Sequence, residues 1–387
     1  MKQRATIVVL ALALAPALLP LETASSKSRH VCFGRTATIV GTSERDRITG
    51  TKRADVIVGL RGSDYIEGKG GNDRICLGPG GRFPNRDQAK GGGGKNRISG
   101  GGGEDSLSGN GGADILRGGA QSDFLLGFGG NDRLFGGGSR DEFWAGAGND
   151  VLRGEGQSDI LLGQEGDDRL IGGEGGPGGD LAAYFEAPRG LVLDLSSGRA
   201  RGEGRDELVG IENVIGGDGS DRIVGDEGNN YVYGRDGSDV IRGQRGDDCL
   251  SGGSGENRIY GGQGFDYLET RTFVLGRRFG CVKDPSSGSI GGTVSGVEVD
   301  LAEGTATREA ENQYALLFKI EGVFGTPWND HLMGDAKSNY LYGGPSSDTI
   351  GGRGGDDVLD GAGSQDQLTG GDGVDECLNG EVLMSCE

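Results

Sequence analysis

The sequence predicts an all-β protein: a right-handed parallel β-roll (a β-solenoid) of 18-residue coils, interrupted by two duplicated β-strand spacers. Three observations predict this fold. A nine-residue pattern recurs along most of the 387 residues. Glycine supplies 84 of them, where an average usage of about 7% would give roughly 27. Only 33% of the residues are hydrophobic, and because the large ones recur at one position of the pattern, the interior must be thin and regular.

The repeating unit is G-G-x-G-x-D-x-U-x, in which U is a large apolar residue. The first position is Gly in 24 of 25 copies, and Ala145 is the exception. The sixth is Asp in 21 copies and Asn in the other four, and the eighth is apolar throughout, with Cys377 its one unusual member. The copies form four blocks, at 41–76, 91–171, 216–269 and 325–378.

Each part of the unit has its own structural expectation. Positions seven to nine can form only a short strand, with position eight pointing inward and its neighbours outward. Positions one to six form a turn, because glycine allows the positive φ that a tight loop needs. Two units make one flattened coil, so residues 18 apart stack at about 4.8 Å.

These motifs resemble a known family. Segments such as GGNDRLFGG, GRDGSDVIRGQRGDD and GGRGGDDVLDGAG are similar to the RTX (haemolysin-type) calcium-binding nonapeptide repeats. The resemblance implies a parallel β-roll that binds Ca²⁺ through the position-six Asp and the loop carbonyls of adjacent coils. It also suggests a secreted bacterial form of the family, and no catalytic domain is visible beside the repeats.

The stacking itself favours a divalent cation. Carboxylates on neighbouring coils would lie roughly 5 Å apart, and each pair would repel by about 3 kcal/mol at an effective dielectric constant of about 20. One buried Leu per repeat contributes only about 1.5–3 kcal/mol, so the calcium-free roll is expected to be marginal or unfolded. Oxygen ligands in flexible loops suit Ca²⁺ better than Mg²⁺ or Zn²⁺. The alternative, that each Asp only caps an Asx turn, explains a few copies and not 21 in register.

Not every copy has Gly at position four. Thirteen copies combine it with Asp at position six, and their carboxylates are the predicted calcium ligands: Asp64, Asp73, Asp105, Asp114, Asp132, Asp150, Asp168, Asp221, Asp239, Asp248, Asp266, Asp357 and Asp375.

Alternate copies of the second block depart together. Gln121, Ser139 and Gln157 replace the position-four Gly, and the same copies carry the outward apolar residues Phe124, Leu126, Trp144, Ile160 and Leu162. We expect this side to bind calcium poorly and its apolar stripe to pack against a spacer, or alternatively against a partner protein.

The segments outside the repeats complete the organisation. Lys2 and Arg4 precede an apolar run and small residues, which predicts a signal peptide and a secreted, extracellular protein. The expected divisions are a signal peptide at 1–26, an N-terminal cap at 27–40, an insertion at 77–90, spacers at 172–215 and 270–324, and a C-terminal cap at 379–387. No later apolar run reaches the roughly 20 residues that span a bilayer, and a net charge of -20 disfavours nucleic acid as a partner.

The spacers show an internal duplication. GLVLDLSSGRA from Gly190 matches GVEVDLAEGTA from Gly296, and LVGIENVIG matches LFKIEGVFG, so residues 190–269 and 296–378 are read as a tandem duplication with extra strands. Their acids, Asp194, Glu212, Asp300 and Glu321, are expected to be solvated strand-edge residues.

The six cysteines suggest disulfides in an exported chain. The repeat register favours Cys32 with Cys76, Cys249 with Cys281, and Cys377 with Cys386.

Catalysis is not expected. Neither His30 nor His331 lies in H-E-x-x-H, and no serine lies in G-x-S-x-G. The predicted function is calcium binding in a structural or surface-associated protein. The alternatives are a calcium-dependent adhesin that binds a protein or carbohydrate and, less favoured, a calcium-dependent envelope hydrolase.

Overall fold

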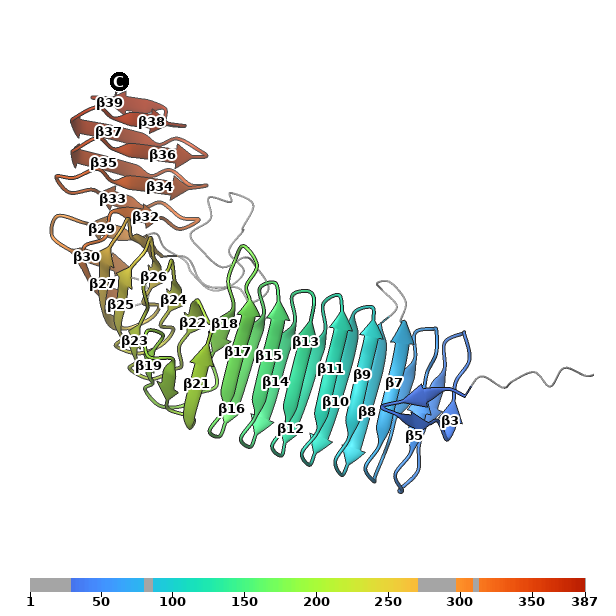
Figure 1. Ribbon diagram of the computed structural model, residues 1–387. Helices are drawn as coiled ribbons and strands as arrows, with labels where there is room; N and C mark the ends of the chain where they lie inside the picture. The colour runs from blue at the N-terminus through green and yellow to red at the C-terminus, as the bar shows by residue number, and fades with distance from the viewer. Residues whose placement is uncertain (1–28, 80–85, 271–296, 309–312, 387) are drawn as a thin grey trace, which may run out of the picture.

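The computed structural model describes residues 29–79, 86–270, 297–308 and 313–386. They form strands and turns without a helix, so none of them supplies an apolar helix that could cross a membrane. Two long sheets face each other along a solenoid (Figure 1). The predicted signal peptide at 1–26 and Cys281 lie outside the described residues.

The first sheet has 16 parallel strands. They are β4 (Arg47–Thr49), β6 (Tyr65–Glu67), β8 (Asp87–Gly93), β10 (Asp105–Gly111), β12 (Phe124–Gly129), β14 (Glu142–Ala147), β16 (Ile160–Glu165), β18 (Leu181–Ala183), β22 (Asn213–Ile215), β24 (Tyr231–Tyr233), β26 (Cys249–Ser251), β28 (Tyr267–Glu269), β32 (Gly322–Phe324), β34 (Tyr340–Gly344), β36 (Val358–Ala362) and β38 (Glu376–Leu378).

The second sheet alternates with the first along the chain, and a short hairpin of β1 (Val31–Cys32) and β2 (Arg35–Thr36) precedes both. In spatial order its strands are β3 (Ile39–Val40), β5 (Val56–Val58), β7 (Arg74–Pro79), β9 (Arg97–Gly102), β11 (Ile115–Ala120), β13 (Arg133–Gly137), β15 (Val151–Gly156), β17 (Arg169–Glu174), β21 (Arg205–Val209), β20 (Arg199–Arg201), β19 (Val192–Asp194), β23 (Arg222–Val224), β25 (Val240–Arg245), β27 (Glu256–Gln263), β31 (Gln313–Phe318), β30 (Thr305–Arg308), β29 (Glu298–Asp300), β33 (His331–Met333), β35 (Thr349–Gly354), β37 (Gln367–Asp372) and β39 (Val382–Met384).

The register confirms the 18-residue coil. Leu116 in β11 pairs with Leu134 in β13, and Leu107 in β10 pairs with Leu125 in β12. These position-eight side chains are 0% exposed and form one continuous core between the sheets. The prediction of an all-β parallel β-roll is therefore confirmed.

The close stacking of turns explains the glycines. Gly130, at position four of its copy, has a φ of 123°, which L side chains rarely adopt. A Cβ there would also meet the backbone of Gly112, one coil earlier, at less than 3.0 Å.

Both spacers have the same topology. In each, two strands pair in parallel with the neighbouring coils, and a third lies antiparallel between them: β20 between β19 and β21, and β30 between β29 and β31. This shared topology supports the predicted duplication. In Figure 1 the stack from β3 to β17 and the stack from β32 to β39 run in different directions, with the spacer strands between them.

Two segments outside the repeat pattern still occupy repeat positions. Asp87 and Ala89, within the expected insertion at 77–90, lie in β8, where Ala89 enters the core. Within the first spacer, Asp180 directly precedes β18, and Ala182 of that strand enters the core in the same way. The turn before Asp180 is longer than usual, because Asp180 follows Gly172 by eight residues where the repeat has five, and residues 175–179 form a loop within it.

Cysteines lie at both ends of the roll. Cys32 and Cys76 are at disulfide distance with Cα atoms 5.7 Å apart, and Cys377 and Cys386 are likewise 5.8 Å apart. Two of the three expected pairs therefore meet. The third pair, Cys249 with Cys281, involves a cysteine outside the described residues.

The outward apolar stripe packs against the first spacer, as expected. Ile160 and Leu162 are 2% and 1% exposed and form a second apolar cluster with Leu181 and other residues that follow in the same sheet. Trp144 packs edge-on against Phe185 of the spacer, with ring centroids 5.7 Å apart.

This contact predicts a fluorescence change. Phe185→Ala should shift the emission of Trp144 to longer wavelength, because water replaces the phenyl ring beside the indole. The spectrum should be recorded in a Trp328→Phe background, since Trp328 is 43% exposed and would mask the shift. An unchanged spectrum would mean that Phe185 does not shield Trp144.

Candidate metal centre

The position-six side chains form two buried rows, one along each edge of the roll. We call the edge whose turns lead from the second sheet to the first the first edge, and the opposite one the second edge. Within a row, the backbone N–H of one Asp donates to Oδ1 of the Asp one coil later. Asp105 donates to Asp123 at 2.8 Å on the first edge, and Asp114 donates to Asp132 at 2.7 Å on the second. In these pairs Oδ1 is therefore used by the fold itself, whereas Oδ1 of Asp105 has no partner.

The other carboxylate oxygen is different. In 17 of the 21 repeat aspartates, Oδ2 is buried and has no hydrogen-bond partner. Twelve of the thirteen predicted ligands are among them, and Asp221 is the exception. The other five follow a non-glycine position four: Asp123, Asp141, Asp159, Asp348 and Asp366. The geometry thus does not separate the two groups, and poorer binding by the substituted copies stays a prediction.

Two of the natural Asn copies show what surrounds this oxygen. Nδ2 of Asn96 donates to the carbonyls of Gly92 and Gly94 in its own turn, at 3.2 and 3.5 Å. It also donates to the carbonyl of Gly109 in the next coil, at 3.5 Å. Asn257 makes the two equivalent bonds within its own turn. The Nδ2 donor of Asn is therefore surrounded by carbonyl acceptors. In an aspartate copy, Oδ2 takes the position of this nitrogen and is itself an acceptor.

An unpartnered carboxylate oxygen among carbonyl oxygens needs a proton or a cation. One carboxylate and several backbone carbonyls, contributed by two adjacent coils, are ligands that fit Ca²⁺. Among the described residues no three His, Cys, Asp or Glu side chains converge, so a bound cation would be held largely by the main chain.

Burial also disfavours the charged carboxylates. Desolvation, and secondarily the neighbouring carboxylates, raises the pKa of Asp105 to about 8, and desolvation has the same effect on Asp123 and Asp159. The pKa of Asp73 rises to about 6 for the same principal reason. The sequence predicted that repulsion between carboxylates along the row would disfavour their charged form. Burial is the larger cause of the raised pKa values, and repulsion is the smaller one.

The remaining copies have a second kind of turn. In Asp46, Asp55, Asp221 and Asp330, Oδ2 accepts the backbone N–H of position two in its own turn. Asn230 and Asn339 accept the same bond through Oδ1. In these six copies position two lacks a positive φ, whereas in the other 19 it has one.

We call these six turns self-satisfied, because the position-six side chain accepts an N–H group of its own turn. They occur at the same place in each block that contains them. They are the first two turns of the first, third and fourth blocks, so each of these blocks begins with one coil that needs no cation at its carboxylates. The prediction that Asp221 is an equivalent ligand is not supported by this geometry, because both its oxygens already accept N–H groups. Three of the six copies have the β-branched Thr at position two, which disfavours positive φ and could have indicated this turn.

The rows continue through residues that the repeat pattern missed. Oδ2 of Asp87 and of Asp180 is buried without a partner, like those of the repeat aspartates. Glu212 and Glu321, expected to be solvated, accept the N–H of Asp180 and Asp266 at 2.7 and 3.1 Å. Each lies two residues before an inward Val, at the offset that separates positions six and eight, and that spacing could have identified them.

Position one lies in a crowded corner, where Ala145 is the one non-glycine residue among the 25 copies. A Cβ on Gly109 would lie less than 3.0 Å from Oδ2 of Asp114, whereas one on Gly111 of the same turn would meet nothing within 4 Å. Gly109→Ala should therefore destabilise the calcium-loaded roll by about 1–3 kcal/mol. Gly111→Ala should be neutral or slightly stabilising. Thermal unfolding in calcium compares the two, and equal midpoints would contradict the crowded corner.

A parallel solenoid with an oxygen-lined corner in most of its turns is a calcium-binding β-roll. The family model of the RTX calcium-binding nonapeptide repeat matches more than half of the chain, and the chain belongs to this family. Calcium is accordingly the ion of these repeats. The matches cover 40–77, 90–125, 126–161, 144–176, 208–241, 215–248, 233–268, 324–359 and 342–377. A search of curated proteins finds no match.

Proposed function

We propose that the chain is a secreted, non-enzymatic structural or surface-associated protein whose roll forms when calcium enters the two carboxylate rows. The observation that carries this proposal is the set of buried, unpartnered Oδ2 atoms at both edges. Such groups destabilise a fold unless an ion neutralises them. Export from a calcium-poor cytoplasm would then keep the chain unfolded until it reaches a calcium-rich exterior.

The proposed ligands are the twelve predicted aspartates with a free Oδ2, together with the carbonyls of positions two and four in the same turn and of position one in the next coil. Asp221 is omitted because both its oxygens have N–H partners. The coil after each spacer would serve as a calcium-independent base on which the following turns stack.

A calcium titration of residues 27–387 by far-UV circular dichroism tests this function. We expect a cooperative gain of β signal with Ca²⁺ and not with the same concentration of Mg²⁺, because flexible, carbonyl-rich loops do not enforce the octahedral geometry that Mg²⁺ demands. A spectrum already folded in chelator at neutral pH, and indifferent to Ca²⁺, would refute the proposal. The disulfides and the apolar core would then suffice for folding.

A further inference from the structure

The first edge departs from the repeat in one stretch of the second block. There, position four is Gln121, Ser139 and Gln157, whereas the second edge keeps Gly in all five of its turns. Gln121 and Gln157 both have a φ of 72°, a conformation that a glycine adopts at lower cost. Glutamine is thus present at two positions where the backbone conformation favours glycine.

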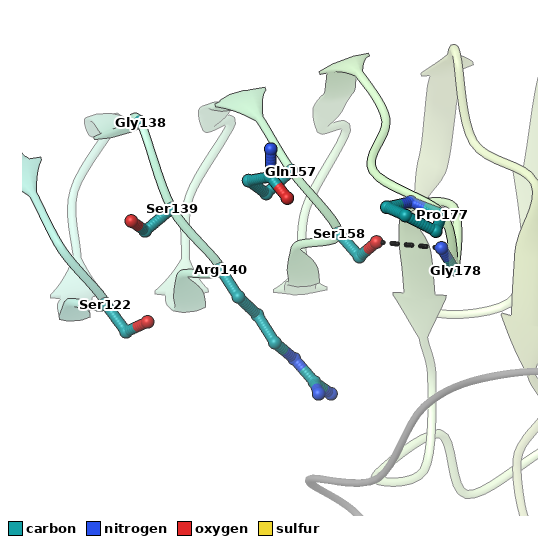
Figure 2. A pocket seen from close by; sticks show the side chains of 8 residues that line it. All are labelled: Ser122, Gly138, Ser139, Arg140, Gln157, Ser158, Pro177 and Gly178. Carbon is teal, nitrogen blue, oxygen red and sulfur yellow. Dashed lines mark hydrogen bonds between the residues drawn. The ribbon is translucent and has the colours of Figure 1, made fainter.

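Two of these side chains, those of Ser139 and Gln157, line a cavity. A cavity of about 430 Å³ lies over the turns that carry Ser122, Ser139, Gln157 and Ser158, and Figure 2 shows these side chains on successive turns of the roll. The loop Gly175–Gly179 closes its end, where the Ser158 hydroxyl accepts the N–H of Gly178 at 3.2 Å. The lining therefore presents hydroxyls and amides on a stacked backbone.

A second cavity adjoins the first on the other side of the same loop. It has a volume of about 530 Å³ and is lined by Glu212, Asn229 and Asp247, with the rings of Tyr231 and Tyr267 beside them. Oδ1 of Asn229 accepts the N–H of Asp247 at 2.8 Å, which fixes the amide against the next turn. The two cavities therefore lie on either side of the loop along the first edge, and we refer to the pair as the groove.

The internal duplication shows that the spacer topology alone does not require this groove. In the second copy, Ser338 takes the place of Asn229 and Glu376 that of Tyr267. Asp266 is the equivalent of Asp180 at the second spacer, and it follows a turn of ordinary length and not a long loop. The two copies share a strand order and differ at the residues that line the groove.

We propose that this groove, from Ser122 to Asp247, binds a neutral saccharide chain. Hydroxyl, amide and carboxylate groups offer both donors and acceptors to sugar hydroxyls.

The lining disfavours other ligands. Glu212, Asp247 and a net charge of -20 oppose an anionic ligand. Arg140 also lines the first cavity, and the carboxylates of Glu142 and Asp159 interact favourably with its charge. A protein partner would be expected to find more apolar anchors. The inference rests on the proposed function, since only a folded roll aligns these turns.

Calorimetric titration of the calcium-loaded full chain tests the site. The probes are neutral hexasaccharides of glucose and mannose in different linkages, with hexagalacturonate as the anionic comparison. We expect one or more neutral probes to bind. The double variant Ser139→Gly, Gln157→Gly, which restores the repeat's own glycine, should weaken that binding at least about fivefold through lost hydrogen bonds. The matched control Ser364→Gly changes a position-four serine outside the groove and should leave binding unchanged.

Three results would overturn the saccharide site: no binding of any neutral probe, binding of hexagalacturonate as tight as that of the best neutral probe, or equal binding by the double variant. Circular dichroism of the same samples separates this failure from failure of the proposed function. A chain that needs no calcium to fold refutes the calcium-driven fold, while a calcium-folded chain that ignores every probe refutes only the groove.

Discussion

In chelator, lowering the pH from about 8 to about 5 should restore β structure that the calcium-free chain lacks at neutral pH. Burial raises the pKa of Asp105, Asp123 and Asp168 to about 8 and that of Asp73 to about 6, from an unfolded value of 3.8. Because these folded-state values are raised, protonation favours the folded roll. The stabilisation is fully present below pH 3.8 and is lost as the pH rises through the range from about 6 to about 8.

Circular dichroism across this range, with and without calcium, measures the effect. The calcium-loaded chain should show the opposite trend and lose stability on acidification, because protons compete with the ion for the same oxygens. A calcium-free chain whose β signal is flat from pH 8 to pH 5 would mean that the carboxylates are not the elements that keep it unfolded.

Replacing one carboxylate by an amide should have opposite effects on the stability of the calcium-free roll at the two kinds of turn. Asp132→Asn keeps the Oδ1 acceptor for Asp114 and removes a buried oxygen that has no partner. By analogy with Asn96, its new amide nitrogen can donate to the carbonyls of positions two and four. We expect the calcium-free roll to gain about 1–3 kcal/mol, and the pH at which it folds in chelator to shift upward. With a ligand lost, calcium should stabilise this variant less than the wild type.

Asp221→Asn is the matched comparison. Both oxygens of Asp221 accept backbone N–H groups, from Leu191 and Gly217, so an amide nitrogen there faces a donor. The calcium-free roll should be destabilised, and its folding pH should shift downward. The same chelator titration reads both variants, and shifts of the same sign would contradict the division into two kinds of turn.

Much of this architecture is predictable because its periods are short. A nine-residue unit of turn and short strand has one large inward side chain, and this period alone places Leu116 over Leu134. The duplication of the spacers was visible for a different reason, the match between GLVLDLSSGRA and GVEVDLAEGTA. The antiparallel placement of β20 and β30 was not, since a strand's direction depends on the loop that leads into it.

The candidate site was predictable in its identity and not in its detail. Asp at position six marked the rows, and the resemblance to calcium-binding repeats named the ion. What could not be read is which oxygen the fold uses. Asp114 and Asp221 occupy the same position of the same motif, yet only Asp114 retains an unpartnered Oδ2, because the peptide at position two is turned differently.

By itself, then, the sequence determined the coil, the inward apolar ladder and the chemistry of the two rows, since each follows from a local period and from residue type. Only the tertiary structure decided the depth at which the carboxylates are buried, the continuation of the rows through Asp87, Asp180, Glu212 and Glu321, and the coils that satisfy themselves. Burial and hydrogen-bond partners depend on the coil stacked above and the coil below, and neither is a property of any single repeat.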